Sequence, residues 1–177
     1  GFYHNGYKDS VWKTYYPNKK LATQFYYING LEDSSFTIFY ENALPKVTGF
    51  YKGGLEHGKW TFYHPKKDKI QQVISFTYGE EDGEWITYYE NGKVESKGYY
   101  MGGLPDRELE YYYENGNLRQ KEYWSSGRLL SVSDYNNENG AFLGKSTLKN
   151  GTGTKFTYFP NGKINIEAPF DSGYAHG

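Results

Sequence analysis

The sequence contains no cysteine, one methionine and no long apolar run, and its charges nearly cancel. Without cysteine the chain forms no disulfide, no thiolate metal site and no cysteine nucleophile. The 20 Lys and Arg residues against 21 Asp and Glu residues leave a net charge of −1, which provides no global attraction to nucleic acid or to an anionic membrane. No stretch is apolar enough for a transmembrane helix, and no charged-then-apolar start predicts a signal peptide. We therefore expect neither nucleic-acid binding nor membrane insertion.

Aromatic residues are what the sequence has in excess. Tyr 21, Phe 11 and Trp 4 make up 20% of the chain, whereas Leu, Ile, Val, Ala and Met together number 29. A conventional core relies on aliphatic residues with a minority of aromatic ones, and disordered chains are poor in both. The composition therefore indicates an ordered chain with an unusual architecture.

A repeat of about 24 residues generates this excess. Asn-Gly, which favours type I′ hairpin turns because both central residues need positive φ, occurs at Asn5, Asn29, Asn91, Asn115, Asn139, Asn150 and Asn161. An aromatic or apolar residue opens each period at Trp12, Phe36, Trp60, Trp85, Leu109 and Phe156, with steps of 24, 24, 25, 24 and 47 residues. The last step is close to two periods, and within it the segment Tyr123–Leu129 copies the turn out of register.

Each period divides into two strands. The second strand starts just after the turn, at Leu21, Ile70, Val94, Leu118 or Ile164, and strand-forming residue types dominate both segments. No apolar stripe of helical period extends over ten or more residues, so helix should be nearly absent. We predict an all-β fold: an elongated, single twisted antiparallel sheet of about seven tandem β-hairpin repeats. Residues 1–177 are expected to form one repeat array, cut from a longer one.

Strand parity places aromatic rows on both faces of this sheet. Trp12 and Tyr16 share one face, whereas Tyr15 points to the other. Either row could be the core of a thin sheet, but two such rows exceed what a core needs. The candidate partner-binding face is the second row, which consists of Tyr15, Phe39, Tyr63, Tyr88, Tyr112 and Phe159.

The segment Gly83–Val94, with the sequence Gly-Glu-Trp-Ile-Thr-Tyr-Tyr-Glu-Asn-Gly-Lys-Val, resembles the MORN-repeat family in its bacterial variant. Gly58–Tyr63 matches the opening of the motif, but its turn is replaced by His64–Lys69. The resemblance implies stacked antiparallel hairpins. It also implies an antitoxin-like or immunity-type protein, or a surface or periplasmic one. It leaves open a cytoplasmic location or export with the signal already removed.

No catalytic, cofactor or metal site emerges from the sequence. The run from Glu80 to Glu84 lacks the alternating oxygen ligands of a calcium loop, and each carboxylate is interpreted as part of a repeated loop or turn. MORN repeats also occur beside lipid-kinase domains, but the kinase phosphate loop and catalytic Asp motif are missing. No metal-ligand spacing connects the four histidines, His4, His57, His64 and His176. The small basic patch of Lys66, Lys67 and Lys69 is interpreted as an exposed turn.

The leading hypothesis is a non-enzymatic scaffold that binds a protein partner through the aromatic-rich repeat surface. The alternative is a carbohydrate- or cell-wall-binding module, because tyrosine rings also stack on sugars. Binding to a membrane surface, with a lipid-kinase label arising from repeat similarity alone, is a further alternative. The residue pattern disfavours an enzyme.

Overall fold

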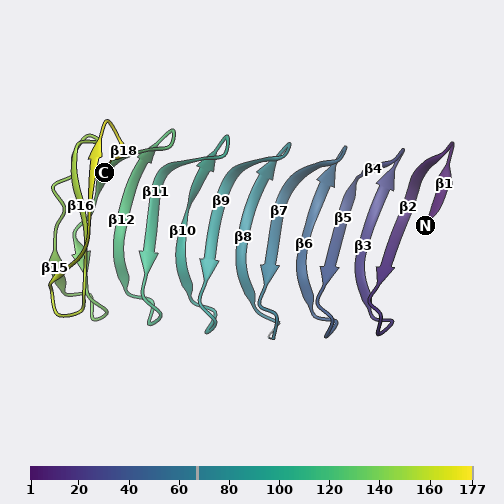
Figure 1. Cartoon of the computed structure of the whole chain (residues 1–177), viewed down its shortest axis with the longest axis horizontal. Helices are drawn as coiled ribbons and strands as arrows, with labels where there is room; N and C mark the ends of the chain where they lie inside the picture. The colour runs from purple at the N-terminus through teal and green to yellow at the C-terminus, as the bar shows by residue number, and fades with distance from the viewer. Residues whose placement is uncertain (67, 177) are drawn as a thin grey trace. The chain divides into compact units, whose positions relative to one another are not determined.

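The computed structural model describes residues 1–66 and 68–176, and these residues contain strands but no helix (Figure 1). The all-β prediction is confirmed. Among the described residues no helix is long and apolar enough to cross a membrane. Lys67, part of the predicted basic patch, lies outside the described residues, while Lys66 and Lys69 are exposed.

The chain divides into two compact units, unit 1 (residues 1–83) and unit 2 (residues 84–177), with the boundary inside one strand. The strands up to this boundary are β1 (Phe2–His4), β2 (Tyr7–Tyr15), β3 (Leu21–Ile28), β4 (Leu31–Glu32), β5 (Ser34–Phe39), β6 (Pro45–Lys52), β7 (Leu55–Tyr63) and β8 (Ile70–Thr77). The later strands are β9 (Glu80–Tyr88), β10 (Val94–Met101), β11 (Leu104–Tyr112), β12 (Leu118–Ser125), β13 (Arg128–Val132), β14 (Tyr135–Asn136), β15 (Phe142–Gly144), β16 (Gly153–Tyr158), β17 (Ile164–Asp171) and β18 (Tyr174–Ala175).

A 13-stranded antiparallel sheet follows the order of the chain from β1 to β13, with β4 beside β3. Strands β14–β15 and β16–β18 form two further small sheets. The predicted starts of the second strands at Leu21, Ile70, Val94, Leu118 and Ile164 coincide with the first residues of β3, β8, β10, β12 and β17. The tandem-hairpin prediction is therefore confirmed.

Two kinds of turn alternate along the chain. Two-residue turns with positive φ at both residues, the type I′ geometry, occur at Asn5–Gly6, Asn29–Gly30, Gly53–Gly54, Tyr78–Gly79, Gly102–Gly103, Ser126–Gly127, Asn150–Gly151 and Ser172–Gly173. The second glycines of these turns follow one another at steps of 24, 24, 25, 24, 24, 24 and 22 residues. They mark the period more regularly than the aromatic residues do.

The other kind is a three-residue loop within a hairpin, as between β9 and β10. The Tyr89 N–H donates to the Lys93 carbonyl at 2.9 Å, and the Gly92 N–H donates to the Tyr89 carbonyl at 2.8 Å. Here only Gly92 has positive φ, because Asn91 instead accepts the Lys93 N–H through its side chain at 2.8 Å. The type I′ prediction is therefore right for Asn5, Asn29 and Asn150. It is wrong for four Asn-Gly pairs, at Asn91, Asn115, Asn139 and Asn161.

The degenerate repeat also keeps the period. Ser126–Gly127, inside the segment that copies the turn, is a type I′ turn between β12 and β13. The three-residue loop of this repeat lies further on, where the Asn137 N–H donates to the Ala141 carbonyl at 2.8 Å. The segment Tyr123–Leu129 therefore contains a two-residue turn, and not a second copy of the three-residue loop at Asn115.

A residue with positive φ bends the first strand of each of the first five hairpins. Ser10, Ser34, Gly58, Gly83 and Arg107 adopt φ values of 64°, 69°, 69°, 122° and 64°. The β6–β7 and β10–β11 registers are interrupted at this position. Such bulges kink a strand toward one face of its sheet. They explain the Gly-x-Trp opening, since glycine reaches this φ without strain and the residue two positions later points into the core.

The core face of unit 1 is a layer of aromatic rings. We call core face the side of the sheet that carries Phe36 and Trp60, which are 3% and 9% exposed. The Phe36 ring lies 4.6 Å from the Trp60 ring and 5.1 Å from the Phe25 ring, measured between centroids. Gly49 allows this approach, since a Cβ there would lie 2.7 Å from a Phe36 ring atom. The first of the two predicted aromatic rows therefore forms the core of unit 1 and is not available for binding.

Candidate functional site

The second aromatic row lies on the other side of the sheet, which we call the tyrosine face. In unit 1 Tyr15 is 61% exposed, whereas Phe39 and Tyr63 are half-buried. Tyr26 and Phe50 on the neighbouring second strands are also exposed. The tyrosine face of unit 1 thus presents aromatic rings to the surroundings while the core face buries them.

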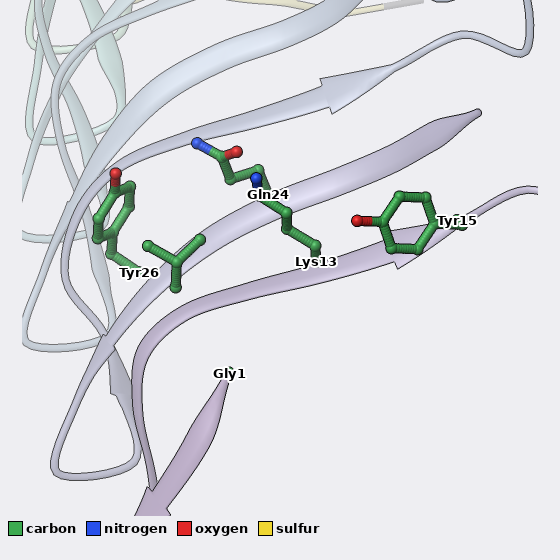
Figure 2. A pocket seen from close by; sticks show the side chains of 6 residues that line it. Gly1, Lys13, Tyr15, Gln24 and Tyr26 are labelled. Carbon is green, nitrogen blue, oxygen red and sulfur yellow. The ribbon is translucent and has the colours of Figure 1, made fainter. Parts of the chain in front are cut away.

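A hollow of about 510 Å³ opens on this face (Figure 2). Lys13 and Gln24 face each other across β2 and β3, and the rings of Tyr15 and Tyr26 lie on either side of them. Rings with polar tips beside a cation and an amide can contact a protein side chain or a sugar.

In unit 2 the tyrosine face carries charge as well as rings. Tyr88 and Tyr112 are half-buried, and the Tyr112 hydroxyl donates to Glu110. Lys97 lies 2.6 Å and Lys121 lies 2.7 Å from the Glu110 carboxylate. Burial alone would raise the pKa of Glu110, but hydrogen bonds from Lys121, Lys97 and Tyr112 outweigh it and lower that pKa to about 2. Glu110 is therefore a fixed anion on this face.

The last candidate, Phe159, lies one position away from the row. Tyr112 pairs with Leu118 after a register break, and Tyr158 pairs with Ile164 after the same break. Tyr158 is therefore the equivalent of Tyr112. The final period has only 22 residues between its type I′ glycines, Gly151 and Gly173. A 24-residue period therefore placed the last member of the row at the wrong residue.

The same offset changes the opening residue of the last repeat. Leu109 precedes the loop residue Asn115 by six positions, and Lys155 precedes Asn161 by six. The prediction of Phe156 as the opening residue is therefore wrong. Lys155 takes the place that Trp12 and Phe36 hold in earlier repeats, because strand parity repeats with the loop.

Lys155 meets a buried carboxylate in unit 2. Glu122 on β12 is 2% exposed and forms an ion pair with Lys155 of β16. The Tyr111 hydroxyl and the Trp124 indole N–H each donate to Glu122 at 2.9 Å. Burial raises the pKa of the Tyr111 hydroxyl, and the Glu122 charge raises it further. Tyr111 is therefore held as a neutral donor.

A cavity of about 300 Å³ adjoins this cluster, and we call it the polar cavity. The side chains that line it are Tyr111, Arg119, Gln120, Glu122, Tyr135, Lys155, Thr157, Asn165 and Ile166. Sequence reasoning missed it by assigning every carboxylate to a loop or turn, whereas Glu122 lies within a strand. The available signal was that Glu122 is two residues before Trp124, and therefore on the same face.

No group of three or more His, Cys, Asp or Glu side chains that could hold a metal ion occurs in residues 1–66 and 68–176. In unit 1 the His57 Nδ1 and His64 Nε2 atoms are buried without a hydrogen-bond partner.

The repeat geometry agrees with the comparison to known families. Residues 8–29, 81–101, 108–125 and 152–172 match the MORN repeat variant. Four segments of the chain are therefore similar to this repeat. Each MORN match covers one hairpin, namely β2–β3, β9–β10, β11–β12 and β16–β17. The hairpin β5–β6, outside the matches, has Ala43 where the matched MORN loop has Gly92. A comparison with curated proteins finds no match to the chain.

Proposed function

We propose that this protein is a non-enzymatic scaffold that binds a protein partner through its tyrosine face. The observation that supports the proposal is the unequal use of the two aromatic rows. Phe36 and Trp60 are buried in the core, while Tyr15, Tyr26 and Phe50 remain exposed on a face that no other layer of the described part of unit 1 covers. Rigid amphipathic rings of this kind dominate the binding energy of protein interfaces.

The resemblance to bacterial MORN-repeat variants makes a toxin-type protein a suitable partner to test first, in an antitoxin- or immunity-like role. The charged groups of unit 2 would then contribute orientation more than affinity, since Glu110 is already paired with Lys97 and Lys121.

The test compares two triple variants of the full chain. Tyr15→Ser, Tyr26→Ser and Phe50→Ser together remove the exposed rings of the tyrosine face. The control stays on the same face but removes no ring: it replaces three exposed aliphatic residues beside the type I′ turns, Ile28→Ser, Leu31→Ser and Leu55→Ser. A partner captured with the wild type is purified and titrated against each variant by calorimetry.

We expect the tyrosine-face variant to lose about tenfold or more in affinity, and the control to lose little. Circular dichroism must show that both variants keep their strand content. Equal affinity of the wild type and the tyrosine-face variant would contradict the proposal.

A carbohydrate- or cell-wall-binding role is the second candidate, supported by the hollow between Tyr15 and Tyr26, where the Gln24 amide lies between two rings. Retention on peptidoglycan or on a glycan panel, abolished by the tyrosine-face variant, would favour it over a protein partner. A chain that no glycan retains would argue against it.

A further inference from the structure

The polar cavity occupies positions that elsewhere belong to the aromatic core. Glu122 pairs with Leu109 across β11 and β12, as Phe25 pairs with Trp12 across β2 and β3. Lys155 likewise takes the opening position of its repeat. Two core positions are thus a carboxylate and an ammonium, which lose hydration on burial that aromatic residues would not lose. Sites that depart from the pattern of their own fold in this way are candidates for function.

The hydrogen bonds of the cluster occupy the Glu122 carboxylate but leave one cationic group and one hydroxyl donor of the lining available. Glu122 already accepts from Tyr111, Trp124 and Lys155. In contrast, the Arg119 guanidinium lies 5.5 Å from the Tyr111 ring centroid, and no described carboxylate lies within ion-pair distance of it.

A neutral hydrogen-bond donor of the lining is also available. The Thr157 hydroxyl is buried and has no hydrogen-bond partner. With Glu122 balanced by Lys155, Arg119 supplies the remaining charge on the lining, and it is positive. The Arg119 guanidinium, which lies over the Tyr111 and Tyr113 rings but has no described carboxylate partner, and the unpaired Thr157 hydroxyl give the cavity the chemistry to take an anion.

We propose that the polar cavity binds a small organic carboxylate. Arg119 would hold the carboxylate group, since its planar fork matches two oxygens, and Thr157 would donate a further hydrogen bond. The volume of about 300 Å³ lies at the lower end of ligand sites, which limits the ligand to a small molecule. The Tyr111 and Tyr135 rings in the lining suit a flat apolar body behind the carboxylate.

The test titrates the full chain, labelled with ¹⁵N, with benzoate, succinate, acetate and inorganic phosphate. The indole N–H of Trp124 reports on the site because it bonds to Glu122. Its signal is assigned by the loss of one peak in Trp124→Phe. We expect a saturable shift with at least one carboxylate, weakened about tenfold in Arg119→Gln and several-fold in Thr157→Val.

Lys46→Gln is the matched control. Lys46 holds the same bulge position on β6 as Arg119 on β12, and its ammonium lies 5.9 Å from the Tyr40 ring. This variant should leave the titration unchanged. Absence of saturation with every carboxylate, saturation by phosphate alone, or equal binding by the wild type and Arg119→Gln would each overturn the proposal.

Discussion

At the scale of the residue, His57 lacks a hydrogen bond to the following turn that two other repeats form. Asp33 accepts the N–H of Gly53 at 3.1 Å, and Asp106 accepts the N–H of Ser126 at 3.0 Å. In both cases a carboxylate at the start of a first strand fixes the following type I′ turn. His57 holds the equivalent position before the turn that begins at Tyr78, but its buried Nδ1 has no partner. This repeat therefore lacks one hydrogen bond.

His57→Asp should restore this hydrogen bond and stabilise the chain. The new carboxylate would accept the Tyr78 N–H, and a bond of this kind contributes about 1 kcal/mol. His57→Ala, which supplies no acceptor and loses the ring contact of 5.3 Å with Tyr78, should not stabilise. Urea unfolding of the three proteins measures the difference. An aspartate variant no more stable than the alanine one would show that the turn does not use the acceptor.

The polar cavity could not be predicted from the sequence, because neither of its charged core residues stands out there. Glu122 resembles other strand carboxylates, such as Glu110, until the hairpins are aligned and it falls opposite Leu109. Lys155 was hidden because the shortened last repeat moved the alignment onto Phe156. The contact between Glu122 and Lys155 joins residues 33 positions apart in different sheets, and no local spacing predicts it. The tyrosine row depends only on alternation within strands and could be predicted from the sequence, except at Phe159, where the shortened last repeat moves the position to Tyr158.

At the scale of the element, the within-hairpin loop explains the recurring Tyr-x-Asn-Gly pattern. The Asn91 side chain accepts a loop N–H through Oδ1, and its Nδ2 donates to the Glu114 carbonyl of the next hairpin at 2.9 Å. The Tyr89 hydroxyl donates to the Tyr112 carbonyl at 2.7 Å. Both bonds span 23 residues, so the loop ties successive hairpins as well as closing its own. The sequence revealed the hairpin, but not this second role, which needs the neighbouring loop in place.

The glycine of this loop can be tested at two equivalent positions. Ala43 and Gly92 both have positive φ, 73° and 88°, at the last residue of the loop. Ala43→Gly should relieve strain and stabilise unit 1 by about 0.5–1 kcal/mol, and Gly92→Ala should destabilise unit 2 by about 1 kcal/mol. Thermal unfolding followed by circular dichroism measures the change in melting temperature of each variant. Shifts of the same sign in the two variants would contradict this account of the loop.

At the scale of the whole molecule, the same kinds of hydrogen bond between successive hairpins occur in both units. At the type I′ turns the Gly54 N–H donates to the Glu32 carbonyl at 2.8 Å, and the Gly127 N–H donates to the Pro105 carbonyl at 2.9 Å. At the loops the Tyr40 hydroxyl donates to the Tyr63 carbonyl at 2.8 Å. Each hairpin is thus held mainly by its neighbours in sequence, so stability should accumulate repeat by repeat.

Deletion of one whole period should therefore preserve the fold. Removing residues 31–54 takes out 24 of 177 residues and joins Gly30 to Leu55, which restores a type I′ turn followed by leucine as at Leu31. Phe25 would then face Trp60 in place of Phe36. We expect a cooperative urea transition whose m-value falls roughly in proportion to length.

The control for this deletion removes half a period. Deleting residues 31–42 takes out β4 and β5 without their partner and joins a type I′ turn to the remainder of a loop. The strand that follows would enter the sheet with the wrong turn and bulge positions, so this variant should lose strand signal by circular dichroism. If both deletions unfold equally, the 24-residue period is not the unit that carries the fold, because a structure built from exchangeable neighbours must tolerate losing one complete neighbour but not half of one.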